Sequence, residues 1–272
     1  MRRAPLLALV LVACALGART DAAAAPAVPA ATVAPASATV AAPSSGLPRL
    51  PPPKDLPRDR PLRAAVVVVD GVFGSELVAA FDVLQHTTAH VRPGIDPFAV
   101  SPDGNPVKTA EGLGVAARYS FASAPAVDIL VLPGGAHDLD SSLGDEALVG
   151  WLAKAGKTAR YVVGLRDAPF VLARAGLLQG RLATVFADDQ DRFTQMFPKL
   201  ELRRGVSFVH DGPLLTSIGG ARSYDAALYL VDHLFGEEVA KGVAKGLVLP
   251  WPPDAEEPPL PALVVRYNEI KK

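Results

Sequence analysis

The chain has 272 residues, 50% of them hydrophobic and 20% charged, with a formal net charge of -1. This length gives room for one medium-sized domain plus tails. Lysine and arginine are scattered rather than clustered, so the composition excludes an electrostatic footprint for nucleic acid, and we expect no nucleic-acid partner.

Residues 1–21 have the layout of a secretory signal peptide or lipoprotein leader. Two arginines precede an apolar run and then small residues, and the run is shorter than the roughly 20 residues that span a bilayer. The only cysteine, Cys14, ends the sequence "LVAC", which resembles the lipobox of bacterial lipoproteins. Lipidation at Cys14 and simple cleavage near Ala22 both stay open. Either predicts an exported protein, periplasmic or anchored to a membrane through lipid alone.

Residues 22–63 form a low-complexity segment rich in alanine and proline. Such a composition cannot bury a core and favours extended polyproline conformations. It predicts a disordered linker, which would serve as a tether or as a plain unstructured N-terminus.

The folded domain is expected over residues 64–250, beginning with the β-branched run "AAVVVVD". Runs of the same kind follow at 97–101, 127–135 and 161–164, as in strands buried on both faces of a parallel sheet. Amphipathic helices are predicted between them, with Ser75 and Asp145 as N-caps. This alternation predicts an α/β fold with a mostly parallel sheet covered by helices on both faces.

The second half continues the pattern less regularly. "RLATVF" and "GVSFVHDGPLLTSIG" predict strands, and Asp211-Gly212 predicts a hairpin turn. "SYDAALYLVDHLFG" predicts a helix capped by Ser223 and ended by Gly236. Residues 251–272 form a Pro-rich C-terminal arm with one expected edge strand at 262–266.

Several segments, in this order, together resemble the ThiJ/PfpI family of the class I glutamine amidotransferase-like superfamily. They are "VVVVDGVFGSELVAAFDVL", "FAVSPDGNPVKTAEGLGVAA", "DILVLPGG", "FVLARAGLLQGRLAT" and "DGPLLTSIGGARSYDAALYLVDHLFGEEVAKGVAKGLVLP". The chain is most similar to the amidotransferase-like domain of AraC-type regulators and to isonitrile hydratase-like enzymes. The resemblance implies a flavodoxin-like three-layer sandwich that commonly forms a homodimer.

The resemblance also implies a catalytic Cys on a strand-to-helix elbow, an acid from the first helix and often a His after the next strand. Glu76 matches the acid, whereas Arg166 stands at the Cys position and Phe186 at the His position. Gly134 and Gly135 match a loop whose backbone amides help to form the family's oxyanion site.

Arginine supplies no nucleophile, so thiol chemistry of the family type is excluded. We expect a degenerate site without a confident catalytic residue, whose candidate ligand-binding residues are Glu76, Gly134, Gly135, Arg166 and Asp167. Three interpretations of Arg166 stay open. It pairs with Glu76 and closes the pocket, it points to solvent from a relaxed turn, or it binds a carboxylate or phosphate in bidentate fashion.

Asp167 could act as a nucleophile or base, or it could cap the helix that begins ahead of Pro169. His137, Asp138 and Asp140 could hold a divalent cation, but no second cluster completes a shell. We therefore expect no metal and no other cofactor.

The remaining candidates are four histidines and two serines: His86, His90, His210, His233, Ser217 and Ser223. His86 and His90 have metal-compatible spacing, but a helix C-terminus also favours histidine. The other two histidines are expected to be structural or exposed. No motif places a histidine beside either serine, and the chain has no phosphate-binding glycine motif.

These observations predict non-catalytic binding of a small anionic ligand or of an envelope protein. The alternative is a hydrolase-like or lyase-like enzyme of altered mechanism that uses Glu76 with Asp167 or a metal. Transcriptional regulation fits poorly because an exported protein would not meet DNA.

Overall fold

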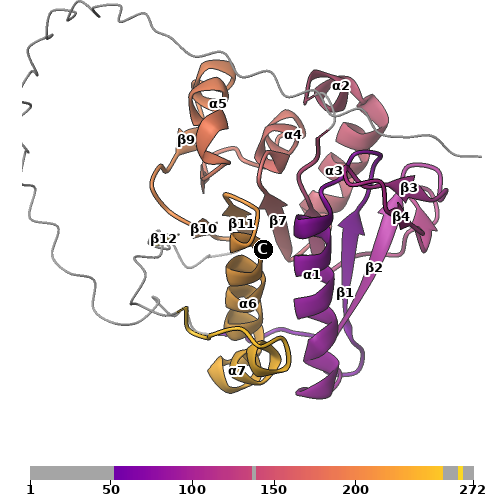
Figure 1. Cartoon of the computed structure of the whole chain (residues 1–272), viewed down its shortest axis with the longest axis vertical. Coiled ribbons are helices and arrows are strands. Elements are labelled where there is room, and N and C mark those ends of the chain that lie inside the picture. Colours follow the sequence, from indigo (N-terminus) through magenta and orange to yellow (C-terminus); the bar gives the residue numbers. More distant parts are fainter. Residues whose placement is uncertain (1–51, 137–138, 254–262, 266–272) are drawn as a thin grey trace, which may run out of the picture. The chain divides into compact units, whose positions relative to one another are not determined.

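The computed structural model describes residues 52–136, 139–253 and 263–265, all within one compact unit, Pro43–Lys272. An eight-stranded sheet runs through this unit in the order β12-β10-β11-β7-β6-β1-β2-β5 (Figure 1). Its strands are β1 (Leu62–Val67), β2 (Ile95–Ser101), β5 (Tyr119–Ser120), β6 (Ile129–Leu132), β7 (Tyr161–Leu165), β10 (Phe208–Asp211), β11 (Leu214–Ser217) and β12 (Leu263–Val265). Two further pairs join β3 (Val107–Lys108) to β4 (Gly114–Val115) and β8 (Leu182–Ala183) to β9 (Glu201–Leu202).

The sheet is mostly parallel, as the β-branched runs predicted. Strands β5, β2, β1, β6, β7 and β11 are parallel, whereas β10 runs antiparallel to β11 and pairs in parallel with β12. Every residue of β6 and β7 is buried. Strands covered on both faces read as continuous apolar runs rather than alternating ones.

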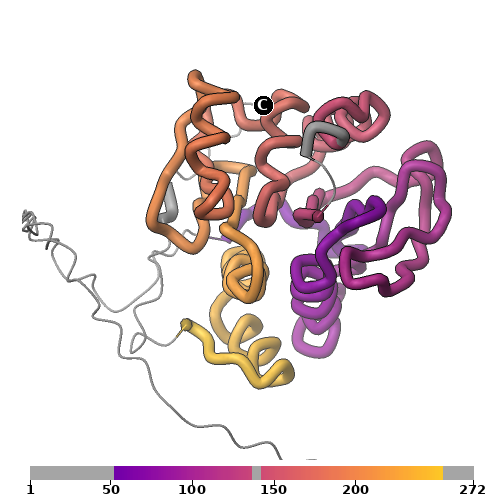
Figure 2. The backbone as a smooth tube through the Cα atoms, turned by 45° about the horizontal axis from the view of Figure 1, so that its top comes forward, coloured from indigo at the N-terminus to yellow at the C-terminus, as the bar shows by residue number. Residues whose placement is uncertain are grey.

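Helices cover both faces of the sheet (Figure 2). One hydrophobic core contains residues of α1 (Gly74–His86), α6 (Arg222–Phe235) and α7 (Glu237–Gly246). The core on the other face contains residues of α3 (Glu146–Thr158), α4 (Ala168–Arg174) and α5 (Gln190–Met196). Shorter segments are α2 (Leu139–Gly144), η1 (Thr87–Ala89) and η2 (Ala187–Asp189). This arrangement is the predicted three-layer sandwich.

Some helix ends match the sequence signals. The Asp145 carboxylate accepts hydrogen bonds from the N–H groups of Ala147 and Leu148, so it caps α3. Gly236 ends α6 with a φ of 89°, which a glycine adopts without steric cost. None of the helices in the part described is long and apolar enough to cross a membrane.

The predicted caps Ser75 and Ser223 are wrong. Helix α1 begins one residue earlier, at Gly74, whose N–H is 3.0 Å from a carboxylate oxygen of Glu111. Helix α6 begins at Arg222, and the buried Ser223 hydroxyl has no hydrogen-bond partner in the described chain. At the start of α1, Glu111 therefore accepts a backbone hydrogen bond, as Ser75 was predicted to do.

The hairpin between β10 and β11 is confirmed. Asp211 pairs with Leu214, so Gly212 and Pro213 make the turn. The segment "RLATVF" differs from expectation, because only the two residues of β8 are extended and they pair with β9 outside the central sheet.

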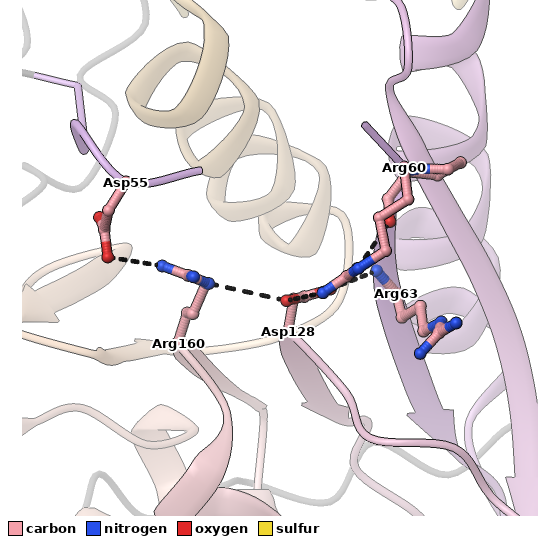
Figure 3. Close-up of polar contacts among 6 residues, drawn as sticks. Asp55, Arg60, Arg63, Asp128 and Arg160 are labelled. Atoms are coloured by element: carbon pink, nitrogen blue, oxygen red, sulfur yellow. Dashed lines mark hydrogen bonds and ion pairs between the residues drawn. The ribbon is translucent and has the colours of Figure 1, made fainter. Parts of the chain in front are cut away.

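The chain enters the sheet through an ion-pair network around Asp128, just before β6 (Figure 3). Both carboxylate oxygens of Asp128 accept from Arg60, at 2.6 and 3.0 Å, and one also accepts from the N–H of Arg63 at 2.8 Å. Arg160 lies 3.6 Å from the same carboxylate and 2.8 Å from Asp55. The end of the segment expected to be a disordered linker is therefore fastened to the domain, and β1 starts at Leu62, two residues earlier than expected.

Candidate functional site

The candidate site lies where β1, β6, β7 and β11 end at the same edge of the sheet. Two backbone hydrogen bonds join these strand ends in pairs. The N–H of Phe73 donates to the Gly134 carbonyl at 2.9 Å, and the N–H of Arg166 donates to the Ser217 carbonyl at 2.9 Å. In open α/β sheets, ligands bind in the crevice outside the carboxyl ends of the strands, so this edge is the first place to look for function.

Arg166 has a left-handed backbone, with a φ of 62°. For a residue other than glycine this conformation costs roughly 1–3 kcal/mol and persists only where the surroundings impose it. The Arg166 carbonyl accepts from the N–H of Phe186 at 3.0 Å, and its own N–H is bound to β11. A strained strand-to-helix turn of this kind exposes the side chain at its tip. The interpretation of a relaxed, ordinary turn is therefore wrong.

Two glycines pack directly against this elbow. A Cβ at Gly219, whose φ is 85°, would lie 2.5 Å from the Cβ of Arg166 and 2.9 Å from its Cα. A Cβ at Gly134 would lie 2.8 Å from the Cβ of Arg166 and would collide with Asp167. Only glycine allows both loops to approach the elbow this closely.

The guanidinium of Arg166 contacts two aromatic rings. Its central carbon lies 3.9 Å from the ring centroid of Phe186 and 4.6 Å from that of Phe73. No contact joins the two rings to each other among the described residues, so the cation is the group that both rings share. Such cation–π contacts are each worth about 0.5–2 kcal/mol, depending on desolvation.

The expected ion pair between Arg166 and Glu76 is not formed. Glu76 is only 1% exposed, and its carboxylate accepts from the Ser75 hydroxyl at 2.6 Å and from the N–H of Gly220 at 2.8 Å. These bonds fasten α1 to the loop after β11. Within the described chain no carboxylate lies within 4.0 Å of the Arg166 guanidinium. A serine hydroxyl and one backbone N–H, rather than the cation, satisfy the buried acid.

Asp167 binds the Gly-Gly loop instead of capping α4. It stands at the N-cap position, but its side chain makes no capping hydrogen bond. One carboxylate oxygen accepts from the N–H of Gly135 at 3.1 Å. Burial raises the pKa of Asp167 to about 6, assisted by the charge of Asp189, while backbone hydrogen bonds and Arg166 act in the opposite direction. The amide that the resemblance assigned to an oxyanion site is thus occupied by the chain's own carboxylate.

A small cavity adjoins Asp167 on the α3 and α4 side of the sheet. Its volume is about 10 Å³, close to the smallest space that holds one water molecule. Apolar groups make most of its wall, which accounts for the poor solvation of the carboxylate. The lining residues are Val67, Val69, Leu132, Pro133, Gly134, Leu148, Asp167, Ala168 and Val171.

Sequence reasoning missed two parts of the site. It treated Phe186 only as a lost histidine and did not consider Phe73, because an aromatic residue beside a helix start is normally taken as core. It also passed over Gly219, although the pair "GG" directly before a helix signals close backbone approach.

The three proposed metal ligands of one loop fall outside the side chains that the structure describes. His137 and Asp138 lie outside the described residues, as does the side chain of Asp140. Among the others, no three His, Cys, Asp or Glu side chains gather as a metal site. His86 instead lies 3.1 Å from the carboxylate of Asp82 in the last turn of α1. Cys14 is also outside the described residues.

Two histidines are buried rather than exposed, far from the elbow in sequence. His210 contacts the Tyr229 hydroxyl at 2.9 Å and the Gly212 carbonyl at 2.8 Å, and His233 contacts the Tyr161 hydroxyl at 2.9 Å. Burial lowers the pKa of each histidine to about 4, and for His210 the neighbouring His233 adds to the effect. The expectation of a structural role is supported.

Of the two serines, Ser217 makes structural hydrogen bonds through its hydroxyl, whereas the Ser223 hydroxyl has no partner in the described chain. Ser217 donates to the Ser207 carbonyl at 3.2 Å and accepts from the N–H of Gly219 at 3.3 Å. Neither Ser217 nor Ser223 is bonded to a histidine in the described part of the molecule.

Comparison with known proteins agrees with this architecture. Residues 62–233 match the model of the DJ-1/PfpI family, and the chain belongs to this family. It is 31% identical over 198 residues to isonitrile hydratase of Pseudomonas putida, an alignment that covers 72% of this chain and 83% of that enzyme. It is 28% identical over 191 residues to protein dj-1beta of Drosophila melanogaster, covering 69% and 97% respectively.

A further relative is the HTH-type transcriptional regulator CdhR of Pseudomonas aeruginosa, 33% identical over 150 residues. That alignment covers 55% of this chain and only 44% of the regulator. The crystal structure of Drosophila melanogaster DJ-1beta superposes with a TM-score of 0.62 at 25% identity, covering 70% of this chain and 100% of that one. The flavodoxin-like fold is therefore shared.

Proposed function

We propose that this DJ-1/PfpI domain has no elbow nucleophile and binds a small anionic ligand through Arg166 without turning it over. The observation that carries the proposal is the strained elbow itself, whose guanidinium contacts two phenyl rings. Strain of this kind clusters at ligand clamps and active sites. An arginine at the tip cannot attack a substrate, but it can hold an anion.

The side chain is suited to this role because its donors are not consumed by the protein. Ring faces attract the cation but accept no conventional hydrogen bond from the edge of the guanidinium. No acceptor bonded to the Arg166 side chain occurs among the described residues. The five N–H donors of an arginine are therefore open to water or to a ligand.

The leader supports a proposal about location. An exported domain, periplasmic or lipid-anchored at Cys14, would meet small ligands or protein partners of the envelope, and the family resemblance supports a homodimer. Mass measurement of the mature N-terminus distinguishes lipidation from simple cleavage, and light scattering measures the oligomeric state.

A second candidate function is acid–base catalysis by Asp167. The raised pKa of about 6 favours it, because a carboxyl group poised near neutrality exchanges protons efficiently. Asp167 lies beside Arg166, so a ligand held by the guanidinium would be close to the carboxyl group. Consumption of a bound compound, lost in Asp167→Asn, would favour catalysis over binding.

Thermal unfolding of the mature protein tests the binding proposal. Acetate and phosphate are added to the native chain, to Arg166→Ala and to Arg118→Ala. Arg118 is the control because its guanidinium also lies over a ring, that of Tyr119, near the other end of the sheet; unlike Arg166, it is paired with an aspartate, Asp96. A ligand at a hundred times its dissociation constant adds about 2.7 kcal/mol of stability.

We expect stabilisation of the native chain and the control but not of Arg166→Ala. Equal stabilisation of all three would place the anion elsewhere and overturn the proposal. Nuclear magnetic resonance spectra of the stabilising compound, recorded over hours with the native chain, report whether it is consumed.

A further inference from the structure

We infer that the ligand at Arg166 is a planar monocarboxylate, and that Phe73 and Phe186 select it by fixing the plane in which the guanidinium can be approached. This inference rests on the proposed function and narrows its ligand class. It also assigns two specificity-determining residues, neither of which the sequence interpretation placed in a binding role.

The first step concerns the direction of approach. The ring centroids lie 3.9 and 4.6 Å from the guanidinium carbon, so both rings crowd the cation. The N–H donors of a guanidinium lie in its own plane, so a hydrogen-bonding ligand must reach its edge. A carboxylate meets that edge with two parallel hydrogen bonds in one plane. A tetrahedral phosphate always carries oxygens above and below such a plane, where the flanking rings leave less room.

The second step concerns charge. The guanidinium is a single positive charge, whereas three carboxyl groups belong to the same edge of the sheet: Glu76, Asp167 and Asp189. Glu76 is hydrogen-bonded to Gly220, and the preceding residue, Gly219, packs against Arg166. The charge of Asp189 helps to raise the pKa of Asp167, the residue next to Arg166. A dianion would be repelled by these groups more strongly than a monoanion.

The third step concerns the remainder of the ligand. Phe73 and Phe186 are both half-buried, and both rings lie against the cation. Partly exposed ring surface next to a charged group favours a ligand whose carboxylate is attached to an apolar or aromatic body. Benzoate is the simplest probe with this chemistry.

The test compares benzoate with two compounds of similar shape, benzamide and phenyl phosphate, on the full mature chain. At about pH 8 the phosphate monoester is a dianion, and benzamide carries no charge. Calorimetric titration should give a dissociation constant for benzoate at least about tenfold below those of both competitors, since a charge-assisted bidentate pair is roughly twice as strong as neutral hydrogen bonds.

Variants separate the roles of the residues. Phe186→Leu and Phe73→Leu should each reduce the preference for benzoate over phenyl phosphate, whereas Phe186→Tyr, which keeps the ring, should retain it. Phe235→Leu, at the far end of α6, controls for loss of an aromatic residue elsewhere. Arg166→Lys keeps the positive charge but loses the planar pair of N–H donors that binds both carboxylate oxygens, so it should bind benzoate at least about tenfold more weakly.

The outcomes are distinct. If phenyl phosphate binds as tightly as benzoate, or benzamide does, the inference fails while anion or ligand binding at Arg166 survives. If the Leu variants keep the native preference, the rings do not select the ligand and the inference also fails. If none of the three compounds binds the native chain, the proposed function fails with it.

Discussion

The guanidinium of Arg166 lies over the ring of Phe186 at 3.9 Å. The proposed function assigns these two residues to the family's Cys and His positions, and the two side chains are in direct contact. Arg166 also accepts a backbone hydrogen bond from Phe186. The two residues therefore form one unit, joined by a cation–π contact between their side chains and by a hydrogen bond between their backbones.

This contact predicts energetic coupling between Arg166 and Phe186. In a double-mutant cycle with Arg166→Ala and Phe186→Ala, we expect a coupling energy of about 0.5–2 kcal/mol in urea unfolding. Additive effects would show that the contact contributes nothing to stability.

Glu76→Gln should destabilise the domain by about 1–3 kcal/mol, because the buried carboxylate accepts from both Ser75 and Gly220, and a neutral amide offers only one acceptor oxygen and no charge to strengthen the bonds. The loss should be the same in an Arg166→Ala background, since no ion pair joins Glu76 to Arg166. A smaller loss in that background would reveal coupling to the cation, and urea unfolding of the four chains decides.

Asp128→Asn should destabilise the domain by about 1–3 kcal/mol, because charge-assisted bonds from Arg60 and Arg63 are weakened. Burial acts to raise the pKa of Asp128, but the bonds from Arg60 and Arg63 and the charges of Arg60 and Arg160 outweigh it and lower the pKa. The stabilisation is therefore present above the unfolded pKa, about 3.9, and is lost as the pH falls through the lower folded value.

The control for Asp128 is Asp96→Asn, which breaks the exposed pair with Arg118 and should cost at most about 1 kcal/mol. Equal losses for both variants in urea unfolding would contradict a special role for the Asp128 network.

Acid should weaken the fold through His210 and His233. Both have a folded pKa of about 4, against about 6.5 in an unfolded chain, so the unfolded state binds more protons between these values. The contribution of these two neutral histidines to the free energy of unfolding is fully present above about pH 6.5 and decreases as the pH falls towards 4. The raised pKa of Asp167 acts in the opposite direction below about pH 6.

Urea unfolding of the native chain and of His233→Gln between these pH values measures the effect. The variant should lose stability less steeply with acid. An identical slope would show that His233 is not kept neutral by the fold.

Much of the fold could be predicted from the sequence because its signals are local. Continuous β-branched runs identified the central parallel strands, and Asp145 and Gly236 marked helix ends that the structure confirms. The predicted Ser75 cap failed because Glu111, distant in sequence, supplies the acceptor. No local pattern contains that contact.

The site was predicted less completely for the same reason. The resemblance placed Glu76 and Arg166 at one site, but the ion pair expected between them is not formed, and Asp167 does not make the expected capping bond. Glu76 is bonded to the Ser75 hydroxyl and the Gly220 N–H, and Asp167 to the Gly135 N–H. The partner of each donor depends on the exact conformation of the loops, which local sequence signals do not specify. The same is true of Phe73, which reaches Arg166 because its loop is bonded to Gly134.

The Asp128 network has a practical consequence for experiments on this protein. It lies where β1 and β6 begin, whereas Arg166 lies where β7, their parallel neighbour, ends. The chain thus joins the sheet at the edge opposite the elbow. A biosensor chip coupled through the N-terminal side should leave Arg166 facing the flowing solution, so immobilisation from that side is the better geometry for measuring weak ligands.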